Sequence, residues 1–236
     1  MSQPKFSLIQ KSLAWFVHIF TASGILAGFM SILAINEKDW QMAMFWLIVS
    51  LFIDGIDGTF ARLFKVKEVL PLMDGKNIDY VIDFANYAII PAYFFYSTEL
   101  VEEAWRLPLT FLILMVSAIY YGKEGMVEDE QYFIGFPVLW NMVVFYLVFV
   151  FEFNALGNTL MILTLSILHF VPIKTAYPSR SKRFKFMNIG VTFIAILTMI
   201  LIVFSFPERN IWMSWIMILS LGYFTGLAIL ETWLKD

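Results

Sequence analysis

The chain contains no cysteine and few charged residues. Among its 236 residues there is no Cys, which excludes disulfide bonds and thiol chemistry. Only 15% of the residues are charged, whereas about 25% is usual in a soluble domain. Hydrophobic residues make up 60% of the sequence, and the mean hydropathy is +0.76. This composition excludes an ordinary soluble enzyme and predicts an all-α, polytopic membrane protein.

Signals for additional domains are also missing. The sequence has no internal repeat and no low-complexity segment, and its length leaves no room for a separate soluble domain. We therefore expect residues 1–236 to form a single membrane domain, with membrane lipids and no nucleic acid as partners. Residues 1–11 are not followed by a small-residue cleavage site after a short apolar core, so we expect no removable signal peptide.

Eight apolar segments approach the roughly 20 residues that a membrane-spanning helix needs. These segments are 13–35, 40–64, 78–96, 107–121, 136–151, 160–173, 189–206 and 211–234. The distribution of Lys and Arg between the connecting loops sets their orientation. With the N-terminus in the cytoplasm, 13 of these cations are cytoplasmic, and three lie outside: Lys38, Arg106 and Arg209. The bias predicts a bundle of about eight helices with both termini in the cytoplasm.

A cluster of acidic residues lies within this apolar chain. Asp54 and Asp57 are three residues apart, and Asp79 and Asp83 are four apart, so each pair shares one face of a helix. Asp54 follows Trp40 by 14 residues, which places it about 21 Å along its segment, in the cytoplasmic half of the bilayer. The next segment starts from the cytoplasm, so its two aspartates lie at a similar depth. The four carboxylates are therefore predicted to converge in a cavity that is open to the cytoplasm.

This cluster indicates a particular chemistry. Carboxylates within a membrane are costly unless cations or water surround them. Their oxygens suit Mg²⁺ or Mn²⁺, and two such ions would clamp a diphosphate. Gly58 and Ala61 are small enough for a ligand to approach closely. Arg62 is a fixed cation suited to phosphate, and Gly75 permits a tight turn. We predict a metal-dependent enzyme that acts on a phosphate-bearing lipid or nucleotide.

Other interpretations of the same residues stay open. The aspartates would be ordinary solvated helix ends if they lay outside the bilayer. Acidic pairs within a membrane also line the paths of cation channels and transporters. Against transport, these carboxylates cluster at one membrane face, and the sequence shows no inverted repeat. Arg62 is alternatively a cytoplasmic anchor of its helix.

The acidic motif resembles the signature of the CDP-alcohol phosphotransferase family, D-x₂-D-G-x₂-A-R-x₈-G-x₃-D-x₃-D. All eight fixed positions are matched, by Asp54, Asp57, Gly58, Ala61, Arg62, Gly75, Asp79 and Asp83. The gap between Arg62 and Gly75 is 12 residues long in this chain, where the common form has eight. The longer gap resembles the bacterial phosphatidylcholine synthase branch, as do W-F-V-H at 15–18, T-A-S-G at 21–24 and Y-P-S-R at 177–180.

The resemblance implies a function and a set of roles. It implies a homodimeric, multi-pass protein of the bacterial inner membrane that transfers the phosphatidyl group of CDP-diacylglycerol to choline and releases CMP. Two Mn²⁺ or Mg²⁺ ions would be held by Asp54, Asp57, Asp79 and Asp83, and Asp83 would also be the catalytic general base. Contacts to the nucleotide would come from Asp54, Gly58, Ala61, Arg62 and Gly75. Serine, inositol or glycerol phosphate as the acceptor would fit the same motif.

Residues outside the motif are candidates for holding the two substrates. Arg180 and Lys182 lie in a basic cluster that sets topology, contacts anionic lipid or binds the donor phosphate. Asn86 follows the last aspartate by about one helical turn and is a candidate acceptor contact. Tyr87 is another candidate acceptor contact. The sequence offers five aromatic residues as walls for cationic choline and does not choose among them: Trp15, Tyr80, Tyr87, Tyr93 and Trp140. His18 is a further acceptor candidate, and otherwise a packing histidine.

Overall fold

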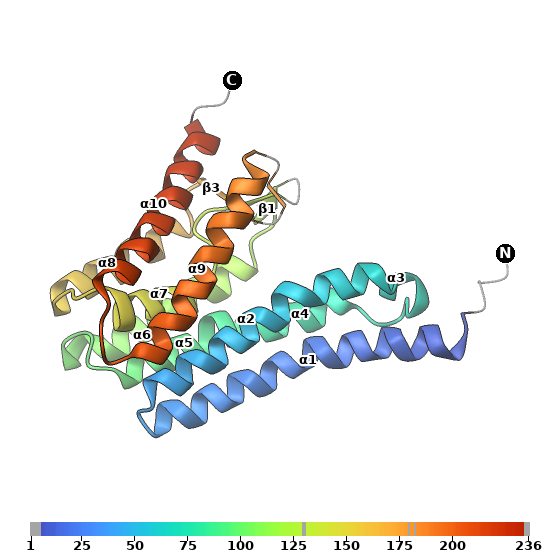
Figure 1. Ribbon diagram of the computed structural model, residues 1–236, viewed down its shortest axis with the longest axis horizontal. Coiled ribbons are helices and arrows are strands. Elements are labelled where there is room, and N and C mark those ends of the chain that lie inside the picture. Colours follow the sequence, from blue (N-terminus) through green and yellow to red (C-terminus); the bar gives the residue numbers. More distant parts are fainter. Residues whose placement is uncertain (1–5, 129–130, 179, 182, 234–236) are drawn as a thin grey trace. The chain divides into compact units, whose positions relative to one another are not determined.

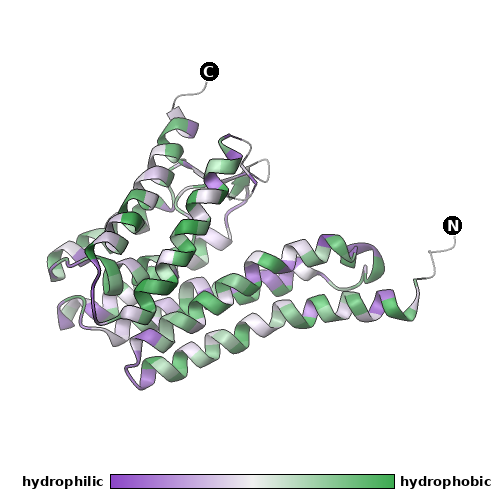
Figure 2. Ribbon diagram, viewed as in Figure 1, coloured by the Kyte–Doolittle hydropathy of each residue, from purple (hydrophilic) through white to green (hydrophobic). Residues whose placement is uncertain are grey.

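The computed structural model describes residues 6–128, 131–178, 180–181 and 183–233 (Figure 1). Contacts along the chain divide it into two compact units, Met1–Ile90 and Pro91–Asp236. Both units are built mainly of helices, and apolar residues predominate along these helices (Figure 2). Each unit has its own internal packing.

Residues 6–89 contain four α-helices and one π-helical turn. These are α1 (Leu8–Asn36), α2 (Trp40–Leu63), α3 (Val66–Val69), α4 (Gly75–Phe84) and the π-helical turn η1 (Ala85–Ile89). α1 begins at a capping box, in which Ser7 and Gln10 exchange hydrogen bonds between side chain and backbone. Asp39 caps α2 by accepting a hydrogen bond from the backbone N–H of Met42 at 3.0 Å. The short turn between them makes α1 and α2 an antiparallel pair that lies side by side (Figure 1).

Small residues line the buried face of α1. They include Ala14, Thr21, Gly24, Ala27, Gly28, Ser31 and Ala34. Small side chains let helix backbones approach closely within a membrane, where van der Waals packing drives helix association. Ser31 uses this proximity to donate a hydrogen bond to the backbone oxygen of Ala43 at 2.8 Å. A Cβ at Gly28 would overlap Oδ1 of Asn86, so η1 packs directly against the backbone of α1.

The long gap within the acidic motif forms ordered structure. After α2 ends, Lys65 adopts the left-handed conformation, with φ of 50°, and precedes the short helix α3 as its N-cap. Val66 and Val69 of α3 pack against Ala14 and Val17 of α1 in a buried apolar cluster. This cluster anchors the connection to α1, and α4 then also lies against α1.

The second unit combines helices with a small antiparallel sheet. Its α-helices are α5 (Ile90–Ser97), α6 (Glu103–Tyr121), α7 (Trp140–Phe145), α8 (Ala155–Leu168), α9 (Lys185–Ser205) and α10 (Ile211–Trp233). A second π-helical turn, η2 (Tyr146–Val150), continues α7. Its strands β1 (Val127–Glu128), β2 (Tyr132–Ile134) and β3 (Lys174–Ala176) lie in the order β1–β2–β3. Gly135 follows β2 with φ of 99°, and a Cβ at this position would overlap the backbone oxygen of His169. Glycine is therefore required where the sheet meets the end of α8.

An aromatic core surrounds His169 in the second unit. The histidine is fully buried and stacks on Trp140, with ring centroids 5.4 Å apart. Tyr120 and Phe136 meet the same ring edge-on. Its Nδ1 lies 2.8 Å from the backbone oxygen of Leu165. His169 is therefore a packing residue that joins the end of α8 to neighbouring aromatic rings.

The all-α, polytopic membrane fold predicted from the sequence is confirmed. Five of the described helices are long and apolar enough to cross a membrane: α1, α2, α6, α9 and α10. The predicted third segment is the uninterrupted helical run α4–η1–α5, and the predicted fifth contains the shorter apolar helix Trp140–Val150. The predicted sixth, 160–173, only overlaps the helix Ala155–Leu168, which begins and ends five residues earlier. The sequence did not predict the sheet or the π-helical turns. The helix of the predicted fifth segment begins at Trp140 and not at residue 136.

Candidate functional site

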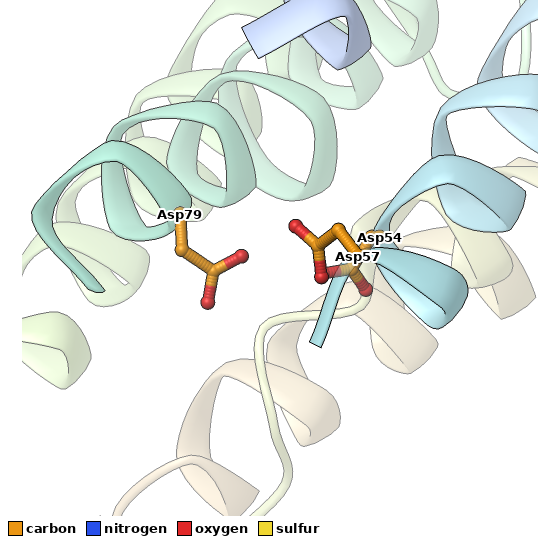
Figure 3. Close-up of side chains that lie close together, drawn as sticks. All are labelled: Asp54, Asp57 and Asp79. Carbon is orange, nitrogen blue, oxygen red and sulfur yellow. The ribbon is translucent and has the colours of Figure 1, made fainter. Parts of the chain in front are cut away.

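Two helices of the first unit carry the four aspartates of the motif. α2 supplies Asp54 and Asp57, and α4 supplies Asp79 and Asp83. Asp54, Asp57 and Asp79 each offer one carboxylate oxygen, and these three oxygens lie within 4.8 Å of one another. Figure 3 shows the carboxylate of Asp79 facing the two carboxylates of α2. The structure thus brings three of the four acids together from two helices that are separated in sequence.

A small pocket adjoins these carboxylates. Its walls come from α1, α2 and α4, and its lining residues are Thr21, Gly24, Ser50, Ile53, Asp54, Asp57, Asp79, Ile82 and Asp83. Asp83 lines the pocket, although it lies outside the group of three close oxygens. Asp57 is buried and accepts a hydrogen bond from the side chain of Thr21, whereas the other three aspartates are half-buried. All four acids therefore border one cavity.

Two polar residues of this pocket were not among the residues predicted from the sequence. Ser50 precedes Asp54 by four residues on α2, so helical spacing alone places it on the same face. Thr21 belongs to α1, and only the packing of α1 against α2 brings it to Asp57. Helical spacing was therefore a signal for Ser50, but nothing in the sequence paired Thr21 with Asp57.

The π-helical turn η1 contacts one of the acids directly. Tyr87 donates a hydrogen bond to Oδ2 of Asp54 at 2.7 Å. Asn86 donates from Nδ2 to the backbone oxygen of Gly24 at 3.1 Å. Both side chains are buried, with exposed fractions of 5% for Tyr87 and 1% for Asn86. Two of the three predicted acceptor residues thus contact an aspartate of the motif and the backbone of α1.

The remaining motif residues on α2 have different surroundings. Gly58 is half-buried, and a Cβ added there would lie 3.5 Å from Nη1 of Arg62. Arg62 is exposed, and its Nη2 donates to Oγ1 of Thr59 at 3.2 Å. Ala61 packs against the apolar cluster between α1 and α3. The arginine therefore lies near the end of α2, where an anionic ligand can reach it.

His18 and Gly75 meet where α1 passes the start of α4. A Cβ at Gly75 would lie 3.3 Å from Cε1 of His18. The histidine is buried, its ring meets Trp15 edge-on, and its Nε2 has no hydrogen-bond partner among the described residues. Glycine at the first position of α4 therefore leaves room for the imidazole beside the helix.

Arg180, in the second unit, lies over an aromatic ring. Its guanidinium carbon is 4.6 Å from the ring centroid of Tyr177, and Phe133 stacks on the same tyrosine at 5.1 Å. Arg180 is exposed, so this stack holds a planar cation at the surface. Lys182, the other basic residue predicted to bind donor phosphate or lipid, lies outside the described residues.

The donor atoms of the pocket fit a hard divalent cation. Carboxylate oxygens are the ligands that Mg²⁺ and Mn²⁺ prefer, and hydroxyl groups of Thr21 and Ser50 lie in the same walls. The pocket has no lysine or arginine among its described lining residues. Cations are therefore the natural counter-charge for these acids.

A comparison with protein families adds an independent observation. A family model described as CDP-alcohol phosphatidyltransferase matches residues 14–171, which include the whole acidic motif. The chain belongs to this family. It is a CDP-alcohol phosphatidyltransferase, and thus a multi-pass membrane transferase of phospholipid biosynthesis.

Individual family members resemble the chain over most of its length. The phosphatidylcholine synthase of Borreliella burgdorferi is 39% identical over 193 residues, which cover 82% of each chain. The phosphatidylcholine synthase of Legionella pneumophila is 34% identical, covering 94% of this chain and 88% of the relative. That of Pseudomonas aeruginosa is also 34% identical, covering 94% of this chain and 92% of the relative. The similarity therefore includes the second unit as well as the motif.

Proposed function

We propose that this phosphatidyltransferase transfers the phosphatidyl group of CDP-diacylglycerol to choline and releases CMP. The observation that carries the chemistry is the convergence of three carboxylate oxygens within 4.8 Å, from two helices. The choice of choline is supported by similarity to phosphatidylcholine synthases over 94% of the chain. Both substrates suit the site, because the donor brings a diphosphate and the acceptor brings a hydroxyl.

We propose Asp54, Asp57, Asp79 and Asp83 as the residues that would hold two divalent ions, Mn²⁺ or Mg²⁺. When bound, such ions neutralise the donor diphosphate and stabilise the charge that develops on departing CMP. The chain itself orients the acids. Thr21 donates a hydrogen bond to Asp57, and Tyr87 donates one to Asp54. Hydrogen bonds of this kind fix the direction of a ligand carboxylate before the ion arrives.

Asp83 is the proposed general base. Its carboxylate lines the pocket and would accept the proton of the choline hydroxyl. As the choline oxygen forms a bond to the β-phosphorus of the donor, the bond from that phosphorus to the bridging oxygen breaks. CMP leaves with the bonding electron pair, and phosphatidylcholine is the other product. The reaction balances without a further reactant.

Other residues are proposed to hold the substrates. The nucleotide would be contacted by Asp54, Gly58, Ala61, Arg62 and Gly75. Exposed Arg180 and its neighbour Lys182 are candidates for a phosphate, either of the donor or of a membrane lipid. Contacts of His18, Asn86 and Tyr87 with the acceptor stay predictions.

We also propose that the protein works as a homodimer in the inner membrane of a bacterium. The excess of Lys and Arg in alternate loops supports a cytoplasmic location for both termini and for the motif. The bacterial origin of the relatives supports the choice of membrane. Residues 1–236 would act as a single membrane domain.

Radiolabelled choline tests the proposed acceptor. Purified protein with CDP-diacylglycerol and Mn²⁺ is expected to form labelled phosphatidylcholine and an equal amount of CMP. Parallel reactions contain serine, inositol or glycerol phosphate in place of choline. Product from one of these, with none from choline, would reject the choline assignment and leave the family chemistry in place.

Two substitutions test the chemistry itself. Asp83→Asn is expected to stop CMP release, because an amide does not accept the hydroxyl proton. Asp39→Asn is the matched control, since asparagine also caps a helix well and Asp39 lies at the opposite end of α2 from the motif. Undiminished CMP release by Asp83→Asn would contradict the proposed role of Asp83 as general base. Cation flux through liposomes that persists in this variant would favour transport.

A further inference from the structure

Tyr87 makes a contact that the acidic motif does not include. Its hydroxyl donates to Oδ2 of Asp54 at 2.7 Å, and its side chain is 5% exposed. The two residues are 33 positions apart, on different helices. A hydrogen bond from a neutral hydroxyl to a carboxylate is shorter and stronger than one between two neutral groups. Tyr87 therefore restrains the rotation of the Asp54 carboxylate.

An unusual stretch of backbone holds the tyrosine in place. Residues Ala85–Ile89 form a π-helical turn, in which the N–H of Ile90 bonds to the backbone oxygen of Ala85. Such turns are rare and occur frequently at functional sites. In this one, three consecutive residues are buried: Asn86, Tyr87 and Ala88. The wider π-helical turn thus allows consecutive side chains to be buried side by side.

Asn86 fixes this turn to α1. Its amide donates to the backbone oxygen of Gly24 at 3.1 Å, and its Oδ1 occupies the space that a Cβ of Gly28 would need. Gly24 also lines the pocket beside the aspartates. The bond from Tyr87 to Asp54 is therefore supported by a second bond, one residue away, that ties the same turn to the neighbouring helix.

We infer that Tyr87 is a positioning residue, which holds the Asp54 carboxylate in the orientation required to bind a divalent cation. This inference rests on the proposed function of the aspartates as metal ligands. It differs from the acceptor role predicted for Tyr87 from the sequence. A residue that positions Asp54 affects the affinity for the cation, whereas an acceptor contact affects the Michaelis constant for choline.

Direct Mn²⁺ binding to purified full-length protein tests the inference. Electron paramagnetic resonance of free Mn²⁺ measures binding without any substrate. Tyr87→Phe removes one oxygen and keeps the ring, and we expect it to weaken Mn²⁺ binding about 10- to 100-fold, as is usual when a group that orients a metal ligand is lost. Tyr146→Phe is the matched control, because the hydroxyl of Tyr146 is also buried and donates to the backbone oxygen of Met217 at 3.0 Å. The control is expected to bind Mn²⁺ as the unmodified protein does.

Kinetics supply a second measurement. With the Tyr87→Phe protein, raising the Mn²⁺ concentration is expected to restore turnover, while the Michaelis constant for choline stays within about twofold of its original value. A raised constant for choline with unchanged Mn²⁺ binding would overturn the inference in favour of the acceptor role. Thermal unfolding in EDTA, compared with Tyr146→Phe, shows whether both variants are folded.

Failure of the inference is distinguishable from failure of the proposed metal site. Asp54→Asn is expected to lose Mn²⁺ binding. If Asp54→Asn loses binding but Tyr87→Phe binds like the unmodified protein, then the inference on Tyr87 is wrong and the metal site stands. If the unmodified protein and Asp54→Asn bind Mn²⁺ equally, or if neither binds it, then the proposed metal site and the inference on Tyr87 are both wrong.

Discussion

Gly28→Ala is a single added methyl group that tests how α1 holds the site. A Cβ at Gly28 would overlap Oδ1 of Asn86 and would lie 2.5 Å from Cδ1 of Ile90. Asn86 is 1% exposed and is hydrogen-bonded to Gly24, so it has little space in which to move. We therefore expect the methyl group to push η1 away from α1.

The size of the effect follows from three contributions. Adding a methyl group to a packed interior typically costs about 1–3 kcal/mol. Loss of the hydrogen bond from Asn86 to Gly24 adds about 1 kcal/mol. Replacing glycine by alanine within a helix returns about 1 kcal/mol. The net expectation for Gly28→Ala is a destabilisation of about 1–3 kcal/mol.

A matched glycine provides the control. Gly190 lies within α9, and a Cβ added there meets no atom within 4 Å. Gly190→Ala is therefore expected to be neutral or slightly stabilising. Thermal unfolding of both variants in the same detergent compares the free energies, and CMP release compares the sites. Because η1 also carries Tyr87, Gly28→Ala is expected to need more Mn²⁺ for half-maximal activity.

Two outcomes would refute this reasoning. Equal unfolding temperatures for Gly28→Ala and Gly190→Ala would show that α1 and η1 are not in tight contact. A destabilised Gly28→Ala protein with an unchanged requirement for Mn²⁺ would show that the contact supports the fold without positioning the acids.

The remaining predictions concern the site and the second unit. Asp57→Ala and Asp79→Ala are each expected to abolish CMP release with little change in expression, because a lost ligand empties a metal site while the surrounding packing persists. Retention of half the activity by either variant would contradict the two-metal proposal. Arg180→Ala is expected to raise the Michaelis constant for CDP-diacylglycerol more than it lowers turnover. An unchanged Michaelis constant for CDP-diacylglycerol would indicate that Arg180 helps only to set the membrane topology.

Local patterns were sufficient for much of the fold. Long apolar runs must satisfy their backbone groups internally within a membrane, so they predict helices without reference to any partner. The first two predicted segments accordingly overlap α1 and α2 closely. The sheet was not predicted, because strands of two and three residues are too short to show a period. The π-helical turn η1 likewise differs from an α-helix in hydrogen bonding and leaves no periodic signal.

The acids of the site and their shared helix faces were determined by the sequence alone. Spacings of three and four residues place Asp54 with Asp57 and Asp79 with Asp83 whatever the helices pack against, because the period of an α-helix is a local property. Tertiary structure decided which groups restrain those acids. Thr21 reaches Asp57 from α1, and Tyr87 reaches Asp54 through a turn anchored on Gly24. Such contacts depend on how closely two helices approach, and that distance is set by packing between residues far apart in the chain.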